Sequence, residues 1–194
     1  MDWNDANLIK VLKEGGVAVM PTDTIYGIVG KALNKDTVLR IYGLKKRAPE
    51  KPFIILIGNI TELEKLSITL SEEQKNKLKE YWQISAMADI CQERAISVVL
   101  DCPDEKFSYL HRGTKTLAIR LPASPSLRKL LLETGPLVAP SANPEGLSPA
   151  QNISQAKTYF SDSVNMYVDG GEISGKASKL IKLHKDGTES ILRE

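Results

Sequence analysis

The chain has 194 residues, of which 42% are hydrophobic, and its formal net charge is +2. This length is enough for one domain with a sizeable core, so we expect a single domain over residues 1–194. The sequence has no apolar run of about 18 residues, and its N-terminal segment carries acidic side chains where a signal peptide is basic. We therefore expect a cytoplasmic protein without a membrane span. The small net charge also argues against a uniformly basic surface that binds nucleic acid.

The cysteines and histidines argue against two classes of site. Cys91 and Cys102 are the only cysteines, which is too few for a disulfide framework, and neither has His or Cys neighbours at metal-ligand spacing. We therefore expect no zinc site, and because no carboxylate cluster in the sequence marks a site for another metal, we predict no metal site. His111 and His184 lie in no recognisable nucleophile motif, so we expect both at the surface.

The first part of the chain alternates between helical and extended patterns. Apolar residues recur at helical spacing over 8–12, with Asn4 or Asp5 as the cap and Gly15 as the stop. A short apolar run then ends in PTDT, a loop of proline and small polar residues. In chain order these patterns predict a helix at 8–12, a strand at 17–20, a loop at 21–24, a helix at 36–46 and a strand at 53–57.

The rest of the chain continues this alternation, which predicts an α/β fold. The strand at 53–57 is apolar on both faces, which predicts a central position in its sheet. Ser71 and Gln74 have the spacing of a capping box at a helix start, and Pro125 suits the first turn of another helix. The later elements are predicted as a helix from 71 to 82, strands at 96–100 and 116–121, a helix from 125 to 135, a strand at 137–139, a helix at 154–160, and strands near MYVDGG, KLIKL and SILR.

A basic cluster closes the helix predicted at 36–46. Lys45 and Arg47 flank Lys46, and Lys51 lies just beyond. These cations repel one another unless an anion sits among them, and an ammonium beside a guanidinium suits the oxygens of a polyphosphate. The same residues also fit a solvated helix end, where basic side chains complement the helix dipole. Taken alone, the cluster favours the solvated interpretation, because such clusters are common on surfaces.

Two polar loops follow apolar strands. Ser141 and Asn143 lie in PSAN, directly after the strand at 137–139, and ligands tend to bind at strand ends in α/β sheets. This loop and the loop PTDTIYG at 21–27, each taken alone, are equally well explained as ordinary turns. The sequence has no Walker loop and no GxGxxG after a strand, so a nucleotide needs another cradle. The second loop, PTDTIYG, gathers polar side chains at one strand end: Thr22, Asp23, Thr24 and Tyr26.

These motifs follow one another in a characteristic order. PTDTIYG is followed by KKR, a strand, TLAIRLP, PSAN with its Gly and Ser, and DGG. This order resembles the YrdC family of threonylcarbamoyl-AMP synthases, in its short, single-domain bacterial type, from about Gly15 to Arg193. The family signature is a K-x-R pair with a later S-x-N, which is much more specific than any single motif. In this sequence the signature falls on Lys45, Arg47, Ser141 and Asn143.

The resemblance implies a fold and a set of binding residues. The implied fold is α/β, with an open, twisted, mixed sheet surrounded by helices and a large, positively lined cavity that binds ATP and threonine side by side. Ser178 stands where the family usually has a serine-threonine pair, but Lys179 replaces the threonine, so we assign it no role. The implied threonine-binding residues are Thr24, Tyr26 and Arg120, and the implied ATP-binding residues are Lys45, Arg47, Thr116, Ser141, Asn143, Ser148 and Arg193.

The resemblance also implies a reaction, that of a nucleotidyltransferase called L-threonylcarbamoyladenylate synthase. The threonine amine captures bicarbonate or CO₂ as a carbamate, whose oxygen attacks the α-phosphorus of ATP and expels pyrophosphate. Lys45 and Arg47 are the implied catalytic residues, because they neutralise charge on the phosphates. Mg²⁺ is expected with ATP, and no tightly bound cofactor is expected. The product serves the tRNA threonylcarbamoyladenosine modification, with a transient hand-over to the tRNA threonylcarbamoyl-transfer proteins.

Two alternatives stay open. An RNA-binding module of the same fold would use the positive cavity for weak phosphate attraction, which fades steeply with salt. A paralogue could keep the fold with lost or altered activity, because fold alone does not fix function. Retention of the complete K-x-R and S-x-N set argues against the paralogue.

Residues 83–95 depart from the family, which usually has a short Pro-Gly turn at this point. This segment, QISAMADICQERA, is an insertion, a lengthened helix or a corrupted reading frame. Ala86, Met87 and Ile90 share one helical face, so we predict that the preceding helix continues through the segment. On this interpretation the segment alters the rim of the cavity and not the chemistry.

Overall fold

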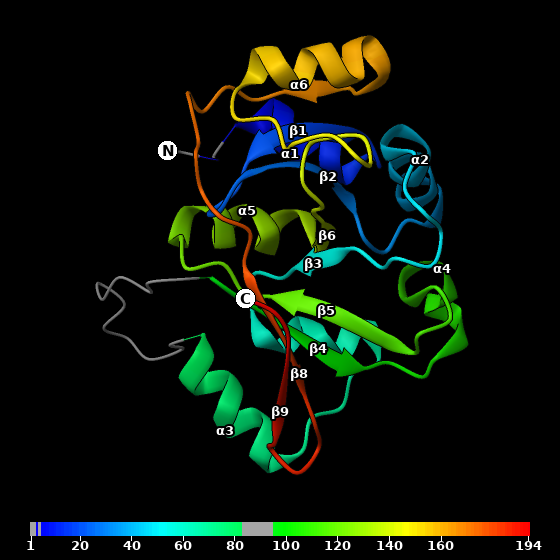
Figure 1. The fold of residues 1–194 in the computed structure, drawn as a ribbon, viewed down its shortest axis with the longest axis vertical. Coiled ribbons are helices and arrows are strands. Elements are labelled where there is room, and N and C mark those ends of the chain that lie inside the picture. The colour runs from blue at the N-terminus through cyan, green and yellow to red at the C-terminus, as the bar shows by residue number, and fades with distance from the viewer. Residues whose placement is uncertain (1–2, 4, 83–94) are drawn as a thin grey trace.

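A computed structural model describes residue 3 and residues 5–82 and 95–194 of the chain (Figure 1). It confirms the α/β fold, because helices pack on a mixed sheet. The described strands are β1 (Val17–Pro21), β2 (Tyr26–Lys31), β3 (Ile54–Leu56), β4 (Ile96–Asp101), β5 (Thr116–Arg120), β6 (Leu137–Val138), β7 (Met166–Tyr167), β8 (Lys179–Leu183) and β9 (Glu189–Arg193). The described helices are α1 (Ala6–Lys13), α2 (Lys35–Lys45), α3 (Glu72–Tyr81), α4 (Ser108–His111), α5 (Pro125–Thr134) and α6 (Ile153–Phe160), with short 3₁₀ turns η1 (Ile60–Leu66), η2 (Glu105–Phe107) and η3 (Ser161–Ser163).

The strands form one sheet in the order β7-β1-β2-β6-β3-β5-β4-β8-β9. Three neighbouring pairs, β1 with β7, β3 with β5, and β4 with β8, run parallel, and the other pairs run antiparallel. The strand predicted to be central, β3, lies in the middle of this order. Its apolar residues on both faces are therefore explained by layers on both sides of the sheet.

The helix starts follow the predicted capping signals. Asp5 caps α1 by accepting from the backbone N–H of Asn7 at 2.8 Å. Ser71 and Gln74 form the predicted capping box of α3, in which each side chain accepts from the backbone N–H of the other residue. Pro125 occupies the first turn of α5, after a Ser124 cap.

One strand was not predicted from the sequence. After β1 the chain turns at residues 22–25 and returns antiparallel as β2, with Pro21 opposite Tyr26. Glycines interrupt the apolar pattern of β2, which weakens the signal of a strand. Gly30 is required by packing, because a Cβ there would lie 2.4 Å from Cγ2 of Thr37 in α2. The glycine therefore lets α2 approach the sheet closely.

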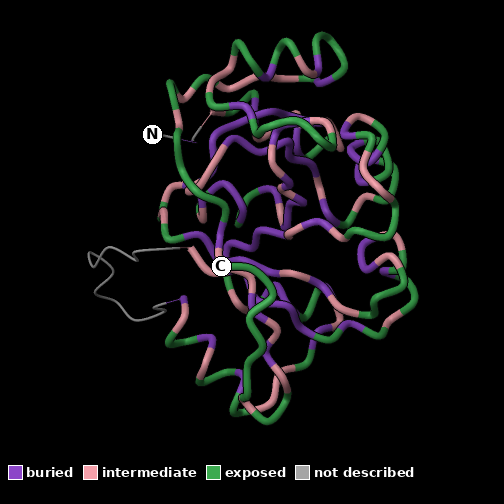
Figure 2. The backbone as a smooth tube through the Cα atoms, in the orientation of Figure 1, coloured by how far each residue is buried: buried purple, intermediate pink, exposed green. Residues whose placement is uncertain are grey.

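The two faces of the sheet are buried in different degrees. In β1, Val17 and Val19 face one apolar cluster, while Ala18 and Met20 face a second cluster that α1 and α5 complete. Figure 2 shows the buried backbone gathered in the strands, with exposed segments around them. The face of β5 and β8 that carries Thr116, Ala118, Leu180 and Lys182 is only half-buried. This partly open face of the sheet is where the candidate site lies.

Two expectations from the sequence need comment. The surface position expected for His111 is wrong, because its side chain is only 1% exposed in α4. Its Nδ1 accepts from the backbone N–H of Gly113 at 3.1 Å, and its buried Nε2 has no hydrogen-bond partner among the described residues. His184 is half-buried. The helical extension expected over 83–95 lies outside the described residues, except for its last residue, and so does Cys91.

Within the described ranges, no helix is both long enough and apolar enough to cross a membrane.

Candidate functional site

A pocket of about 220 Å³ opens on the half-buried face of the sheet, where several strand ends and loops meet. We call it the arginine pocket, because Arg47, Arg120 and Arg193 all line it. These side chains come from the end of α2, the end of β5 and the end of β9. The predicted site residues that line this pocket are Thr24, Arg47, Arg120, Ser141 and Arg193, and Ser178, to which the sequence assigned no role, lines it too.

Lys45 joins the two halves of the family signature. Its side chain is 1% exposed, and its Nζ donates to the backbone carbonyls of Ser141 and Asn143. The Oδ1 of Asn143 lies 3.4 Å from the same Nζ, and its Nδ2 donates to the carbonyl of Leu147 at 2.6 Å. Lys45 and Asn143 therefore hold the PSAN loop in shape, and neither side chain is among those that line the arginine pocket.

The protonation of Lys45 is poised near neutral pH. Burial is the largest cause that lowers the pKa of its amine to about 7, and the charge of Arg47 lowers it further. The carboxylate of Glu145 opposes this shift. An amine with this pKa gains a proton when a further negative charge approaches.

A latch on the outer side of the PSAN loop ties it to the end of α2. The carboxylate of Glu145 accepts from the backbone N–H of Ala48 at 2.6 Å and pairs with Lys51. The backbone N–H of Glu145 donates to the carbonyl of Lys45 at 2.7 Å. The hydrogen bond from Lys51 is the main cause that lowers the pKa of Glu145. Arg47 lines the arginine pocket, and its Nε donates to the carbonyl of Lys51 at 3.1 Å.

Arg120 is a buried cation at the back of the pocket. Its side chain is 5% exposed, and its Nη2 donates to Asp23 at 2.9 Å. Burial lowers the pKa of Arg120, and Asp23 opposes this shift. Its Nε is buried and has no hydrogen-bond partner among the described residues. A buried N–H without a partner is costly, so Arg120 is well suited to receive an anionic group of a ligand.

Tyr26 anchors a segment that crosses the site. Its side chain is fully buried, and its hydroxyl donates to the carbonyl of Gly171 and accepts from the N–H of Gly170, both at 2.8 Å. It is not among the described residues that line the arginine pocket. Tyr26 thus fixes the start of residues 170–178, which we call the strap; in Figure 1 it is the orange segment that descends from β7 to β8.

The strap lies directly against the loop between β1 and β2. A Cβ on Gly175 would lie 1.8 Å from the carbonyl oxygen of Thr24, so only glycine fits there. At the end of the strap, the Oγ of Ser178 is 2.7 Å from the Oγ of Ser97, and Nη2 of Arg193 donates to the carbonyl of Ser178 at 2.7 Å. The strap is therefore held at both ends and pressed onto Thr24 between them.

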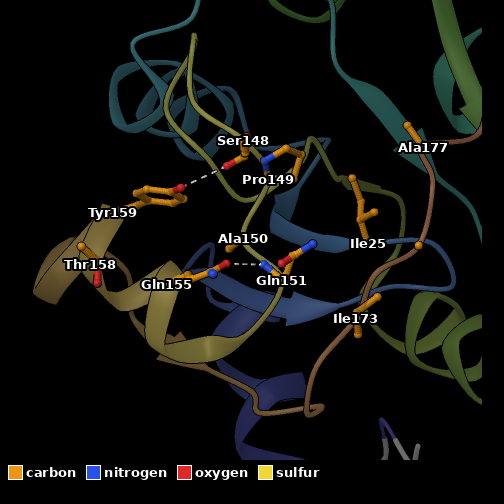
Figure 3. Close-up of a pocket in the computed structure, with 11 residues that line it drawn as sticks. Ile25, Ser148, Pro149, Ala150, Gln151, Gln155, Thr158, Tyr159, Ile173 and Ala177 are labelled. Carbon is orange, nitrogen blue, oxygen red and sulfur yellow. Dashed lines mark hydrogen bonds between the residues drawn. The ribbon is translucent and has the colours of Figure 1, made fainter.

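A larger pocket of about 610 Å³ lies beside the strap, which lines it with Ile173, Gly175 and Ala177 (Figure 3). We call it the neutral pocket, because none of the described residues that line it is charged. Ser148 is here, with its carbonyl accepting from the hydroxyl of Tyr159 at 3.1 Å. Ile25, Pro149 and Ala177 line both pockets, so the two pockets adjoin one another.

Thr116 lies apart from the other predicted residues. It stands at the start of β5, four residues before Arg120. At roughly 3.3 Å per residue, this spacing separates the two positions by about 13 Å. Thr116 lines a separate pocket of about 450 Å³ at that end of the sheet face.

Comparison with known proteins identifies the family. A family model for Sua5, YciO and YrdC proteins, described as "Telomere recombination", matches residues 10–194. This chain belongs to the Sua5/YciO/YrdC family. The Hahella chejuensis threonylcarbamoyl-AMP synthase is 28% identical over 193 residues, which cover 99% of this chain and 98% of that protein. The Bacillus subtilis protein of the same name is 32% identical over 168 residues, 86% of this chain but only 46% of that protein.

Solved structures support the same assignment. P. abyssi Sua5 complexed with L-threonine has a TM-score of 0.75 and 29% identity, and covers 90% of this chain and 49% of that one. E. coli YciO has a TM-score of 0.76 at 21% identity, and covers 97% of this chain and 87% of that one, a likeness that shows the fold alone. The chain thus spans about half the length of some relatives and nearly all of others.

The Sua5/YciO/YrdC signature accounts for part of the site, and the structure adds residues that the sequence did not assign. Asp23 stood in the polar loop without a role, and its pairing with Arg120 needed the fold. Ser97 gave no signal, because a serine inside an apolar strand is usually structural. The large positive cavity implied by the resemblance stays a prediction, since the arginines line a pocket of only about 220 Å³.

Proposed function

We propose that this chain makes threonylcarbamoyl-AMP and pyrophosphate from L-threonine, bicarbonate or CO₂, and ATP. The observation that carries the proposal is the bond from Lys45 to the PSAN loop, because it joins the K-x-R and S-x-N motifs beside a pocket lined by arginines. The names of the synthase relatives and the L-threonine complex of P. abyssi Sua5 support it.

The threonine end of the site is assigned to Arg120 and Thr24. The guanidinium of Arg120 has an unpaired Nε, which suits the carboxylate of an amino acid. The Oγ1 of Thr24 lies 3.1 Å from the Oγ1 of Thr22, so a pair of hydroxyls is available to bind polar groups of threonine. Tyr26 acts on this end indirectly, through the strap.

The phosphate end is assigned to Arg47, Arg193 and Ser141. Two guanidinium groups and a hydroxyl suit the oxygens of a triphosphate and the charge that develops on the leaving pyrophosphate. Lys45 is then a positioning residue that holds the loop, and its charge stabilises the same phosphates from behind. Asp23, the carboxylate beside the pocket, is paired with Arg120, so Mg²⁺ is assigned to the nucleotide and not to a protein site.

The reaction needs no protein nucleophile. The neutral amine nitrogen of threonine forms a bond to the carbon of CO₂ and releases one proton. With bicarbonate, that proton leaves together with a hydroxide from the bicarbonate carbon, as one water molecule. An oxygen of this carbamate then bonds to the α-phosphorus, and the bond from that phosphorus to the pyrophosphate oxygen breaks. The chain contributes alignment and charge, which for two bound reactants is a large part of the barrier.

Incubation of the purified protein with MgATP, bicarbonate and labelled threonine tests the proposal. We expect labelled threonylcarbamoyl-AMP and pyrophosphate in equal amounts, and at least tenfold less of both with R47A, a loss of about 1.4 kcal/mol or more in transition-state stabilisation. Valine should be rejected strongly, because it leaves the polar groups of the site unpaired, and serine more mildly. Equal pyrophosphate release with all three amino acids would remove threonine as the substrate.

A further inference from the structure

A third pocket lies on the same half-buried sheet face as the arginine pocket, at its opposite end. Along β8, Leu180 lines the arginine pocket and Lys182 lines this one. The volume of about 450 Å³ is within the usual range of small-molecule sites, roughly 300–1,000 Å³. We call it the lysine pocket, after three of its lining residues: Lys115, Lys182 and Lys185.

The charge balance of the lysine pocket is positive. Asp101 is the acidic residue among its described lining residues. Lys115 has a carboxylate partner, Glu105, at 3.5 Å, but both side chains are largely exposed, so this pair neutralises little. Within the described part of the chain, Lys182 and Lys185 have no carboxylate within 4.0 Å. Because the whole chain carries a formal charge of only +2, this excess of positive charge is a local feature.

Hydroxyl groups surround these ammonium groups. The Oγ of Ser67 accepts from Lys106 at 2.8 Å, and its hydroxyl bonds to the carboxylate of Asp104. The hydroxyl of Thr114 donates to the carbonyl of His111 at 2.7 Å, and that of Thr116 donates to Thr114 at 3.2 Å, whereas Thr69 lines the pocket without a hydrogen-bond partner for its hydroxyl among the described residues. The ammonium groups, with the hydroxyl of Thr69 beside them, are therefore the donors that can bind phosphate oxygens here.

The backbone at the rim is held in an unusual conformation. Ser67 and Lys115 both have a φ of 54°, in the left-handed region that side chains rarely adopt. Such residues concentrate at functional sites, where surrounding contacts hold them. No aromatic residue is among the described residues that line the pocket, so it offers no surface on which a nucleobase could stack. The chemistry therefore favours phosphate groups over bases.

We propose that the lysine pocket is a binding site for phosphate oxyanions, separate from the arginine pocket. Such oxyanions come from a free polyphosphate or from the backbone of an RNA strand. The test measures binding to the full chain with two probes, sodium tripolyphosphate and a fluorescent single-stranded RNA of about 12 nucleotides. Because the readout is binding and not turnover, the result does not depend on the function proposed above.

The test variant is K182A/K185A, and the matched control is K10A/K13A, which removes two exposed lysines from α1. We expect the test variant to bind at least one probe tenfold or more weakly, with the control within twofold of the parent. If the source is RNA, the slope of log affinity against log salt falls by about 1.4, which is two contacts at roughly 0.7 each. If it is a free polyphosphate, only the tripolyphosphate arm changes.

A fold check keeps the result interpretable. The double variant K182Q/K185Q keeps most of each side-chain stem, and it must lose binding like the alanine variant while melting within a few degrees of the parent. In the parent, tripolyphosphate should shift the backbone amide signals of Thr69, Thr114 and Lys185 in NMR spectra. If both probes bind the test and control variants within twofold of each other, the proposal is overturned.

Discussion

Replacing Gly175 with alanine tests whether the strap fixes the threonine end of the arginine pocket. The new Cβ would lie 1.8 Å from the carbonyl oxygen of Thr24, whereas real Cβ atoms essentially never come within 3.0 Å of another atom. The strap and the loop must therefore separate by about 1.2 Å, and because the contacted atom belongs to the backbone, no side-chain rotation can absorb this. A misplacement of about 1 Å costs up to roughly 100-fold in rate, so we expect kcat/KM for threonine to fall by roughly 10- to 100-fold, or about 1.4–2.7 kcal/mol.

The assay is threonine-dependent release of pyrophosphate, together with the rise in Tm on adding L-threonine, which reports binding without turnover. Gly43→Ala is the matched control, because a Cβ there meets nothing within 4 Å and alanine favours the helix. The control should keep the kinetics of the parent. If G175A matches the control in both measurements, the contact with Thr24 does not shape the site, and the reasoning fails.

Three further predictions address other parts of the molecule. Because bound phosphates raise the pKa of Lys45 from about 7, binding of a non-hydrolysable ATP analogue at pH 8 should take up as much as about 0.9 proton per protein molecule. Calorimetry in two buffers of different ionisation enthalpy measures this proton uptake, and an equal uptake by the K45M variant would contradict the prediction. The R120K variant keeps a positive charge but loses the planar guanidinium group, so KM for threonine should rise at least about tenfold while KM for ATP changes less. A parallel rise in both KM values would argue against the assignment of Arg120 to the threonine end of the site. The S71A variant loses the cap of α3 and the 2.6 Å hydrogen bond to the carbonyl of Lys185, which should lower the free energy of unfolding by about 1–3 kcal/mol. Thermal unfolding should show a clear drop in Tm for S71A and no change for the control variant S154A, which alters an exposed serine. Equal Tm values for the two variants would refute this.

Local signals predicted most elements of this fold, because caps and periodicity act within a few residues. The capping box at Ser71 and the Pro125 start are such signals, and both helices form where expected. The β2 strand was missed because Gly27 and Gly30 break its apolar pattern, and their reason lies in the close approach of other segments. The burial of His111 was missed because its partner, an N–H of the following turn, has no sequence signature.

The candidate site was predicted from motifs, and its contacts depend on residues far apart in the chain. The order of the motifs brought Lys45 and Ser141 into one prediction, but only the fold shows that the first binds the backbone of the second. Tyr26 was expected to bind threonine, and in the structure its hydroxyl holds backbone groups 144 and 145 residues away. No local pattern specifies such a partner. The role of Gly175 likewise needs the position of Thr24.

The pairing of β1 with β7 cannot form during protein synthesis until β7 has been made. Ala18 lies opposite Met166, and the backbone N–H of Val17 donates to Asn165, 148 residues later. At roughly 5–20 residues per second, the ribosome needs about 7–30 s to make that stretch. For this interval β1 has β2 on one side and an unpaired edge on the other, which is open to other chains. The nascent protein is therefore most exposed to mispairing before β7 is made, and a chaperone that shields the β1 edge would act in this period.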